Sequence, residues 1–539
     1  MRKLKIAILD LVTKGPTRAL YARVMHPNLA SIMPQVIAVW CKQEGHDVKF
    51  ICYTGFENLF EELPVDIDLV FIGAFTQSAQ LSYAISNLFR QHCAVTVLGG
   101  PHARCYPENA CKYFDYVLGF TDKQLIHDLL QDYAPHRPLG VHLTAKQQPS
   151  DLPSVEERWE FIEPTIKKAP AIKFVPLIGS LGCPYTCNFC IDSRVDFCPL
   201  DFEQMKADLR FLLKKMKRPR VGWHDPNFGV RFDDCMNAIE EAVPPNSIDF
   251  VAESSLSLLS ESRLQRLQRN GFKAILPGIE SWFDLCNKSK SGIRMGEKKV
   301  RYVAEHMNNI LRYIPYVRAN FILGLDTDQG AEPFELTKRF LDLVPGAFPG
   351  FGLLTAFGEA APLNLELQRA GRILPFPFHF LTNSQAMNVR PLNYTWIELY
   401  DRIIDLLRYS FSWRSIRRRF AAQGSTIPGW MNVLSAVSSE GFGRLKYQRM
   451  IREMLDTDVT VRRFFEGETT VIPSFYHEHV KQDLGPLWEF LPQGALEHDP
   501  NMYLKKQTAS KEIVQLQDKA PPRIYKALDS PEISIIPEQ

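Results

Sequence analysis

Short apolar segments alternate with amphipathic segments along most of this chain. Five apolar, strand-like runs lie within residues 5–120, and helical spacing appears between them, as in PQVIAVWCKQEG at 34–45. A chain with this alternation buries its strands and helices together in a parallel sheet whose two faces are covered by helices. We therefore predict an α/β fold that begins with a doubly wound, Rossmann-like domain over residues 1–135.

A second alternating series starts at FVPLIGSL (174–181) and ends at GFGLLTAF (350–357). It contains six strand–helix units, whereas a closed TIM barrel needs eight, so we predict a partial (β/α)6 barrel over residues 173–375. The segments PHRPLG and KQQPSDLPSVEER, rich in proline and charge, predict a linker over residues 136–172. In both kinds of domain, ligands bind at the carboxyl ends of the strands.

The pattern changes after Pro375. WIELYDRIIDLLRYSFSWRSIRRRF (396–420) and residues 444–464 have helical spacing. We predict a mainly helical C-terminal domain over residues 376–506, followed by a polar, proline-punctuated and poorly ordered tail over residues 507–539. The substrate is expected to enter between the two α/β domains and against these helices, where four aromatic side chains could line its path: Trp413, Trp430, Phe475 and Tyr476.

Composition excludes several classes of protein. A net charge of +2 over 539 residues gives no field that would attract a nucleic acid, so none is expected as a partner. No uninterrupted apolar run reaches the roughly 18 residues of a membrane-spanning helix, so no transmembrane segment is expected. The eleven cysteines are scattered except for one group, which fits a reducing compartment and predicts a cytoplasmic location.

That group lies in GSLGCPYTCNFCIDSRV, at Cys183, Cys187 and Cys190, directly after the first strand of the predicted barrel. A structural zinc site needs four ligands, so His224 or Cys198 would have to supply the fourth. Three thiolates suit a [4Fe–4S] cluster in which one iron keeps an open position. Zinc, unrelated thiols and the cluster all stay possible on these residues alone, and the cluster is favoured.

CPYTCNFC resembles the radical S-adenosylmethionine (SAM) signature CxxxCxΦC, in which Φ is aromatic, here Phe189. The resemblance implies that Cys183, Cys187 and Cys190 are catalytic residues that hold a [4Fe–4S] cluster. It implies that the open iron binds the amino and carboxylate groups of SAM. It further implies reductive cleavage of SAM to a carbon radical, with an electron donor such as flavodoxin or ferredoxin.

Other stretches resemble the same family in the expected order. GIES (278–281) is similar to its strand-end motif near the amino acid part of SAM, FILGL (321–325) to the strand near the adenosine, and WHDPNFGV (223–230) to a turn of the cobalamin-associated branch. Any of these residues could instead only end a strand. The resemblance and the charges of SAM imply contacts with SAM at Phe189, Asp225, Glu253, Gly278, Glu280, Ser281, Arg318 and Asn320.

TVLGGPHARCYPENACKYFDYVLGF (96–120) resembles the B12-binding domains that are fused to radical SAM cores. The resemblance implies cobalamin at the carboxyl edge of the first sheet, near Thr76, Ser78, Gly99, Gly100 and His102, although Gly99-Gly100 could instead only make a tight turn. Two features depart from the family. The stretch after the first strand, LDLVTKGPTRALYARVMHPN, lacks the D-x-H-x-x-G loop whose histidine ligates cobalt, and FTDK (120–123) stands where relatives usually carry GEGE.

These observations leave several reactions open. With cobalamin, the expected reaction is methylation of a small-molecule substrate in a biosynthetic pathway. Without it, the 3-amino-3-carboxypropyl group of SAM could be transferred to an acceptor such as arsenic, or a radical could drive cyclisation or rearrangement. The competing class is a non-catalytic iron–sulfur redox sensor, but a sensor has no need of the GIES and FILGL strand ends.

Overall fold

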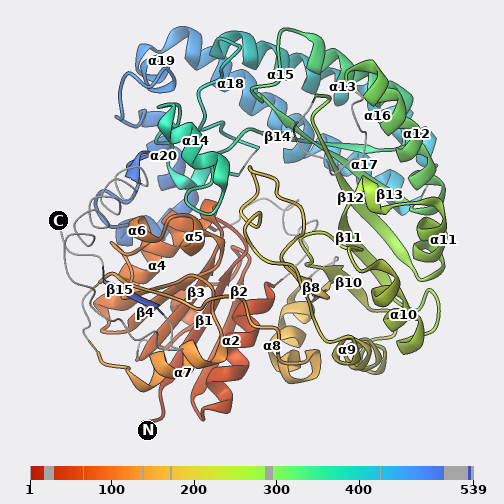
Figure 1. The fold of residues 1–539 in the computed structure, drawn as a ribbon. Helices are drawn as coiled ribbons and strands as arrows, with labels where there is room; N and C mark the ends of the chain where they lie inside the picture. The colour runs from red at the N-terminus through yellow and green to blue at the C-terminus, as the bar shows by residue number, and fades with distance from the viewer. Residues whose placement is uncertain are drawn as a thin grey trace, which may run out of the picture.

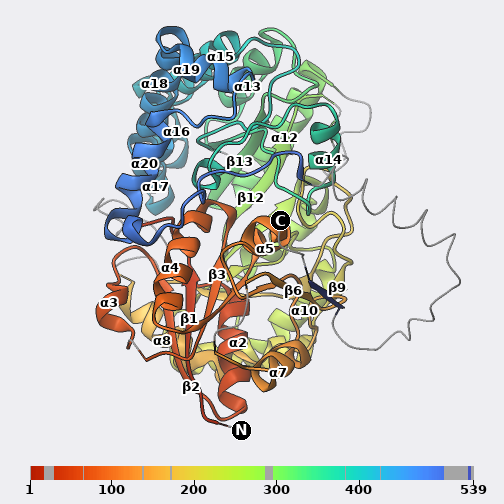
Figure 2. The same cartoon turned by 90° about the vertical axis from the view of Figure 1, so that its left-hand side faces the viewer.

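The structure is a computed structural model that describes residues 2–16, 30–64, 66–135, 139–169, 173–283, 285, 295–382, 384–424 and 426–502, together with the backbone of residues 532–535. Two parallel sheets dominate it. The first (red to orange) and the second (olive to green) lie in separate parts of the molecule, and the C-terminal helices (blue) lie along the second (Figures 1 and 2).

The first sheet has the strand order β15-β6-β5-β4-β3-β1-β2. Strand β1 pairs in parallel with both β2 and β3, which places Leu9 opposite Ile51 and Ile72. In doubly wound sheets of order 2-1-3-4-5, the ligand crevice opens between β1 and β3, where the strand order reverses. The predicted Rossmann-like fold is therefore confirmed. The strands are β1 (Lys5–Leu11), β2 (Asp47–Tyr53), β3 (Leu69–Ala74), β4 (Val95–Gly99), β5 (Tyr116–Leu118), β6 (Val141–Thr144) and β15 (Glu532–Ile535), the last antiparallel to β6.

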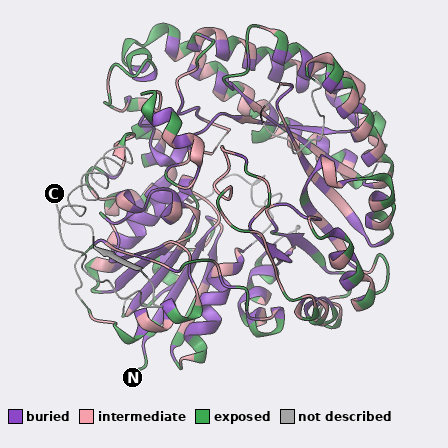
Figure 3. Cartoon of the chain, in the orientation of Figure 1, coloured by how far each residue is buried: buried purple, intermediate pink, exposed green. Residues whose placement is uncertain are grey.

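Helices cover both faces of this sheet, so its central strands are buried on both sides, as parallel strands require. In β1 only Lys5 is exposed, and Figure 3 shows the strands of both sheets as mostly buried. The helices of this part are α2 (Ile32–Gln43), α3 (Leu59–Glu62), η1 (Thr76–Ser78), α4 (Ala79–Gln91), α5 (Pro101–Cys105), α6 (Pro107–Ala110) and α7 (Lys123–Gln131).

The segment predicted as a linker, residues 136–172, contains regular structure. Strand β6 extends the first sheet, and helix α8 (Val155–Lys168) begins with a capping box between Ser154 and Glu157. The proline and charge of this segment misled the prediction, because α8 is stabilised by the burial of Phe161, Ile162 and Ile166 rather than by its overall composition. The first α/β unit therefore extends past residue 135. Of the predicted tail, only strand β15 lies among the described residues.

The second sheet has the order β14-β13-β12-β11-β10-β7, and every neighbouring pair is parallel. Six strands that do not close confirm the predicted partial barrel. The strands are β7 (Val175–Leu177), β10 (Arg220–Trp223), β11 (Asp249–Ser255), β12 (Phe272–Glu280), β13 (Tyr316–Leu323) and β14 (Phe348–Leu353). A separate hairpin-like pair, β8 (Ser180–Leu181) and β9 (Cys198–Pro199), follows β7.

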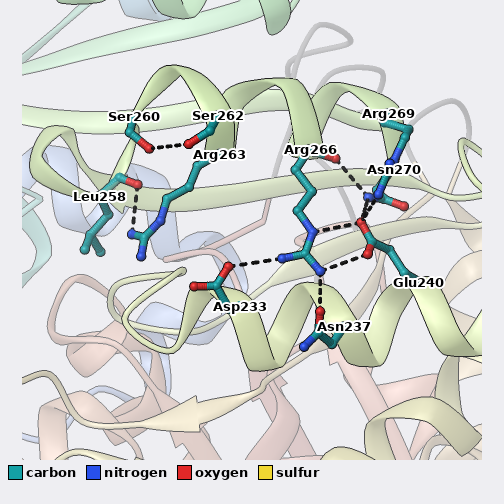
Figure 4. Close-up of polar contacts among 10 residues, drawn as sticks. All are labelled: Asp233, Asn237, Glu240, Leu258, Ser260, Ser262, Arg263, Arg266, Arg269 and Asn270. Carbon is teal, nitrogen blue, oxygen red and sulfur yellow. Dashed lines mark hydrogen bonds and ion pairs between the residues drawn. The ribbon is translucent and has the colours of Figure 1, made fainter.

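Five helices cover the outer side of the barrel: α9 (Phe202–Lys215), α10 (Phe232–Ala242), α11 (Glu261–Arg269), α12 (Glu297–Tyr313) and α13 (Glu332–Leu343). An ion-pair network joins α10 to α11 (Figure 4). Arg266 donates to both carboxylate oxygens of Glu240, at 2.9 and 2.8 Å, and to Asp233 at 3.1 Å. The hydrogen bonds from Arg266 lower the pKa of Glu240 to about 2, so this network stays charged at neutral pH.

The C-terminal part is mainly helical, as predicted, and its helices line one side of the barrel down to the first sheet (Figure 2). No helix in the described ranges is long and apolar enough to cross a membrane. The elements of the C-terminal part are α14 (Pro362–Arg369), η4 (Phe378–Phe380), α15 (Trp396–Ser410), α16 (Trp413–Gln423), α17 (Ile427–Val437), η5 (Ser439–Gly443), α18 (Arg444–Thr457), α19 (Val459–Phe465), α20 (Ser474–Leu484) and η6 (Gly485–Phe490). The barrel also contains the 3₁₀ turn η2 (Leu256–Leu258).

Candidate functional site

The three grouped cysteines lie on a loop that the β8–β9 pair closes at its base. Gly182, directly before Cys183, has φ +65°, and a Cβ there would lie 2.2 Å from the carbonyl oxygen of Asp196, so only glycine fits. The backbone N–H of Asp192 donates to Cys190 Sγ at 3.4 Å. Hydrogen bonds of this kind to thiolate ligands tune iron–sulfur clusters.

No disulfide joins any of the ten cysteines that the structure describes. Among all the residues that the structure describes, no group of three or more His, Cys, Asp or Glu side chains is arranged to hold a single metal ion. In a [4Fe–4S] cluster each cysteine binds a different iron, so its three thiols need not converge on one point as the ligands of a single ion do.

Asp225, at the end of β10, holds the start of the cysteine loop. Its carboxylate accepts the backbone N–H of Gly179 at 2.9 Å and the hydroxyl of Ser180 at 2.6 Å. Burial raises the pKa of Asp225 to about 6. The sequence predicted a SAM contact for this residue, which stays a prediction; in the structure its carboxylate binds Gly179 and Ser180.

Replacing Asp225 with alanine is expected to destabilise the loop, because the Gly179 N–H and the Ser180 hydroxyl would lose their acceptor in a buried place. We expect a loss of about 2 kcal/mol in the free energy of unfolding, measured by thermal denaturation, and faster loss of iron from reconstituted protein. Ser180→Ala removes only one of the two hydrogen bonds and should show about half of the effect. Equal stability of Asp225→Ala and the unmodified protein would contradict this role.

The first domain also binds the cysteine loop. Arg104 of α5 donates to Asp192 Oδ1 at 3.0 Å and to the carbonyl of Ile191 at 2.9 Å, and its guanidinium stacks 4.8 Å from the ring centre of Phe120. The loop is tied to the barrel as well: Tyr185 Oη lies 3.0 Å from Ser257 Oγ. Contacts from two domains thus reach the loop at Tyr185, between Cys183 and Cys187, and at Ile191 and Asp192, directly after Cys190.

Arg104→Met is expected to loosen the loop while keeping most of the packing of the side chain. We predict about tenfold faster loss of iron to a chelator, since removing a partly buried charged hydrogen-bond donor costs on the order of 1.5–3 kcal/mol locally. Arg231→Met is the matched control, because Arg231 also combines an ion pair, with Asp234, and a ring contact, with Phe202, on the surface away from the loop. Similar iron retention in the two variants would refute a clamping role for Arg104.

A cavity of about 570 Å³ lies where the carboxyl edges of the two sheets meet. Its first-domain wall includes Asp10, Gly73, Gly99 and Gly100, at the ends of β1, β3 and β4. This is the crevice that the strand order of a doubly wound sheet predicts. The opposite wall is built by the cysteine loop and the end of β10, with Leu181, Gly182, Asp192, Val195, His224 and Pro226.

The structure places two of the five predicted cobalamin residues, Gly99 and Gly100, on the cavity wall. Thr76 and Ser78 do not line it, because they form the 3₁₀ turn η1, which directs Phe75 and Gln77 toward the cavity instead. Ser78 Oγ donates to the carbonyl of Thr13.

His102 also lies away from the cavity lining. It is fully buried, its Nε2 lies 2.6 Å from Tyr83 Oη, and burial lowers its pKa to about 3. Helix α5 begins at Pro101 and turns the His102 side chain onto α4 rather than toward the strand edge.

Four predicted SAM residues share the carboxyl ends of β12 and β13. Gly278 pairs in register with Asn320, and a bulge separates Gly278 from Glu280. Glu280 has φ +65°, and a Cβ on Gly278 would lie 2.1 Å from Glu280 Oε1, so the glycine leaves room for this carboxylate. A positive φ outside glycine is costly and concentrates at functional sites. Ser281 Oγ accepts the N–H of Phe283 at 3.1 Å. The contacts of these residues with SAM stay a prediction.

The remaining predicted SAM residues lie on β11, on the cysteine loop and on β13. Glu253 is exposed on β11, and Phe189 is half-buried on the cysteine loop. Arg318 lies on β13 two residues before Asn320, and its Nη1 forms an ion pair at 3.1 Å with Glu440 of η5 in the C-terminal part. Arg318 is thus linked to a partner that the sequence did not predict.

Sequence reasoning missed several polar residues of the cavity, among them Asp10, Arg104 and His224. Burial raises the pKa of Asp10 to about 6 and lowers the pKa of His224 to about 4, so His224 is a neutral imidazole on the cavity wall at pH 7. His224 was considered only as a zinc ligand. Its place directly after a barrel strand was the available signal, whereas nothing in the sequence pairs Arg104 with a loop 88 residues away.

The four aromatic residues expected along the substrate path do not line this cavity. Tyr476 is buried in an aromatic cluster with Phe376 and Phe380. Trp413 and Trp430 are more than half exposed on α16 and α17. Core packing and surface exposure therefore explain these side chains.

Comparison with known proteins extends these observations. No protein-family model matches the chain. Bacteriochlorophyllide d C-8(2)-methyltransferase of Chlorobaculum tepidum is 26% identical over 376 residues, which cover 63% of this chain and 80% of that protein. Hopanoid C-2 methylase of Rhodopseudomonas palustris is 25% identical over 371 residues, covering 64% and 66%.

The solved structure of the cobalamin-dependent S-adenosylmethionine radical enzyme OxsB with aqua-cobalamin bound covers 94% of this chain and 84% of its own, with a TM-score of 0.54 and 12% identity. This likeness concerns the fold. The cysteine motif on its barrel loop, the two parallel sheets and the methyltransferase relatives all agree with the resemblance to radical SAM enzymes that carry an N-terminal B12-binding-type domain.

Proposed function

We propose that this enzyme methylates a small-molecule substrate in a biosynthetic pathway, using a [4Fe–4S] cluster, SAM and cobalamin. The cavity of about 570 Å³ carries this proposal, because the glycine edge of the first sheet and the cysteine loop face each other across it. A methyl donor held by one domain and a radical generated at the other must meet in a shared, enclosed space. The methyltransferase relatives support the reaction class.

The residues present fit both groups. Three thiols within eight residues and an N–H···S hydrogen bond to Cys190 suit an iron–sulfur cluster. The first-domain wall of the cavity carries Gly73, Gly99 and Gly100, and a Cβ on Gly99 would meet no atom within 4 Å. A wall without side chains lets a broad, flat ligand approach the backbone closely.

When bound, the cluster supplies the electron that cleaves SAM, and cobalamin supplies a transferable methyl group. The chain supplies position and enclosure. Asp225 and Arg104 fix the two ends of the cysteine loop, and the carboxylate of Glu280 together with Asn320 presents polar atoms at the neighbouring strand ends. His224 stays a neutral imidazole at the cavity wall, because burial lowers its pKa to about 4, and it can take part in hydrogen bonds there.

The same reasoning supports a reducing, cytoplasmic location with flavodoxin or ferredoxin as the electron donor. The described cysteines form no disulfide, and a cluster of this type must be reduced by a low-potential donor. The absence of a nucleic-acid partner stays a prediction from the near-zero net charge.

One observation favours a second reaction. The segment after β1, where other B12 proteins carry the cobalt-binding histidine, is anchored to the C-terminal part: Lys14 Nζ donates to Gln385 at 2.8 Å and to the carbonyl of His379 at 3.2 Å. His26, the histidine of this segment, lies outside the described residues. If the first domain has kept its fold without cobalamin, transfer of the 3-amino-3-carboxypropyl group of SAM to an acceptor such as arsenic becomes the alternative.

Anaerobic reconstitution with iron and sulfide, with and without hydroxocobalamin, tests the proposal. After addition of SAM and a low-potential reductant, we expect 5′-deoxyadenosine, and S-adenosylhomocysteine only when the corrinoid is present. Methylthioadenosine without deoxyadenosine would instead support aminocarboxypropyl transfer. No consumption of SAM under any reductant would contradict both reactions and favour a redox sensor.

A further inference from the structure

Polar atoms without partners are concentrated on one face of α18. Arg444 Nε and Nη2, Tyr447 Oη and Gln448 Oε1 are buried and make no hydrogen bond in the structure. Residues at i, i+3 and i+4 lie on the same side of a helix. Buried polar groups in native proteins nearly always have a partner, so three neighbouring exceptions require an explanation.

Arg372 shows which hydrogen bonds an arginine with a structural role makes in this chain. Arg372 binds both carboxylate oxygens of Asp326 at 2.7 Å and donates its Nε to the carbonyl of Arg390 at 2.9 Å. Arg444 has no comparable set. Burial lowers its pKa to about 10, which still leaves the guanidinium charged at pH 7.

The surroundings of Arg444 carry excess positive charge. Arg318 lies close enough to repel it, and Glu440 close enough to attract it. Glu440 already forms an ion pair with Arg318. Two guanidinium groups therefore share one carboxylate, and a second negative charge would balance the group.

The backbone around these residues is shaped to bring them together. A Cβ on Gly350 of β14 would lie 2.4 Å from Asn320 Oδ1 and 2.6 Å from Arg318 Nε, so this glycine makes room for both side chains on the same face of the barrel sheet. Glu440 lies on η5, a single π-helical turn that leads directly into α18. Such turns are rare and are frequent at functional sites.

We propose that Arg444 and Arg318 bind an oxyanion of the substrate, a carboxylate or phosphate group, and that Tyr447 donates a hydrogen bond to it. A guanidinium presents a fork of N–H donors that matches such groups. Arg444 and Tyr447 come from helix α18, outside the strands predicted to hold SAM, whereas Arg318 lies on β13 and is itself among the predicted SAM contacts. The assignment to the substrate rests on the proposed function, whereas the binding of an oxyanion does not.

The test uses full-length, anaerobically reconstituted protein and thermal unfolding in inorganic phosphate, in acetate and in chloride at equal ionic strength. A ligand that binds only the folded state raises the Tm. We expect phosphate or acetate to raise the Tm of the unmodified protein above its value in chloride, and whichever acts at lower concentration indicates the group. Arg444→Met should weaken this response at least tenfold and, in chloride, raise the Tm, because it removes a buried charge without a partner.

Two further variants keep the test decisive. Arg452 lies on the same helix and forms an ion pair with Asp401. Arg452→Met loses this ion pair but should keep the full rise in Tm that the oxyanion causes. Tyr447→Phe removes only the hydroxyl and should weaken the response severalfold even if Arg444→Met folds poorly. An oxyanion response that is absent from the unmodified protein, or unchanged in both Arg444→Met and Tyr447→Phe, overturns the site.

Cleavage of SAM without substrate separates this inference from the proposed function. Phosphate or acetate, whichever raises the Tm, should leave the rate at which the unmodified protein forms 5′-deoxyadenosine unchanged. A loss of this cleavage would overturn the assignment to the substrate, because the oxyanion would then be the carboxylate of SAM. If the unmodified protein forms no deoxyadenosine, the proposed function fails, while the thermal response still decides whether the oxyanion site exists.

Discussion

Cys187→Ala is expected to lower the rate of SAM cleavage by about 10³-fold or more, because residues that act as one unit lose nearly the whole function when one of them is removed. Cys187 is the most buried of the three grouped cysteines, and alanine fills the place of its side chain without adding a polar group. The fold should therefore persist while the cluster is lost. Iron and sulfide content, the absorbance of the reconstituted cluster and the yield of 5′-deoxyadenosine measure the effect.

Cys198→Ala is the matched control for this experiment. Cys198 lies on β9, eight residues after Cys190, and its Sγ donates to the carbonyl of Pro199 at 3.7 Å. It should retain its iron and cleave SAM within about twofold of the unmodified rate, since replacements of this kind away from a special feature change little. A Cys187→Ala variant that kept its cluster, or a Cys198→Ala variant that lost it, would show that the ligands are wrongly assigned.

Gly99→Leu is expected to weaken the binding of hydroxocobalamin by about 100-fold, which corresponds to roughly 3 kcal/mol. Gly99 lies at the end of β4 on the cavity wall, and a Cβ there would meet no atom within 4 Å. The leucine side chain can therefore extend into the cavity without displacing the backbone, and it would occupy the space of the ligand. Absorbance of bound corrinoid after gel filtration measures the loss.

The same variant should keep its Tm and its cleavage of SAM, because the cysteine loop is untouched. Gly100→Ala provides the contrast: Gly100 has φ +93°, and a Cβ would lie 2.9 Å from the carbonyl oxygen of Ala74, so this change should lower the Tm instead. Unchanged corrinoid binding by Gly99→Leu would move the cobalamin site away from this cavity and strengthen the case for aminocarboxypropyl transfer.

Local patterns were enough to predict both sheets. Strand β1 is a run of apolar residues with one exposed end, and β13 alternates between buried Phe321 and partly exposed Asn320, so each pattern specifies how the strand is covered. Composition did not predict the regular structure of residues 136–172. Helix α8 in this segment depends on a few buried side chains and a capping box, which the overall composition does not reveal.

The candidate site, too, was predicted only in part from the sequence. The chemistry of Cys183, Cys187 and Cys190 depends on their spacing, which is a property of the sequence. The direction of a side chain depends on the turn that follows a strand, and so the predictions for Thr76, Ser78 and His102 missed the cavity while their neighbours Phe75 and Gln77 line it. A one-residue change in the start of a turn moves a side chain to the other side of the backbone.

The sequence by itself determined the alternating α/β architecture, and it favoured a [4Fe–4S] centre and a radical SAM enzyme, because periodicity and motif spacing act over a few residues. Only the tertiary structure decided that Arg104 binds the cysteine loop, that Glu440 reaches Arg318, and that two guanidinium nitrogens of Arg444 are buried without a hydrogen bond. These relations join residues about 90 to 130 positions apart or depend on what surrounds a side chain. Packing of the whole chain establishes them, and no local pattern records which distant groups it brings together.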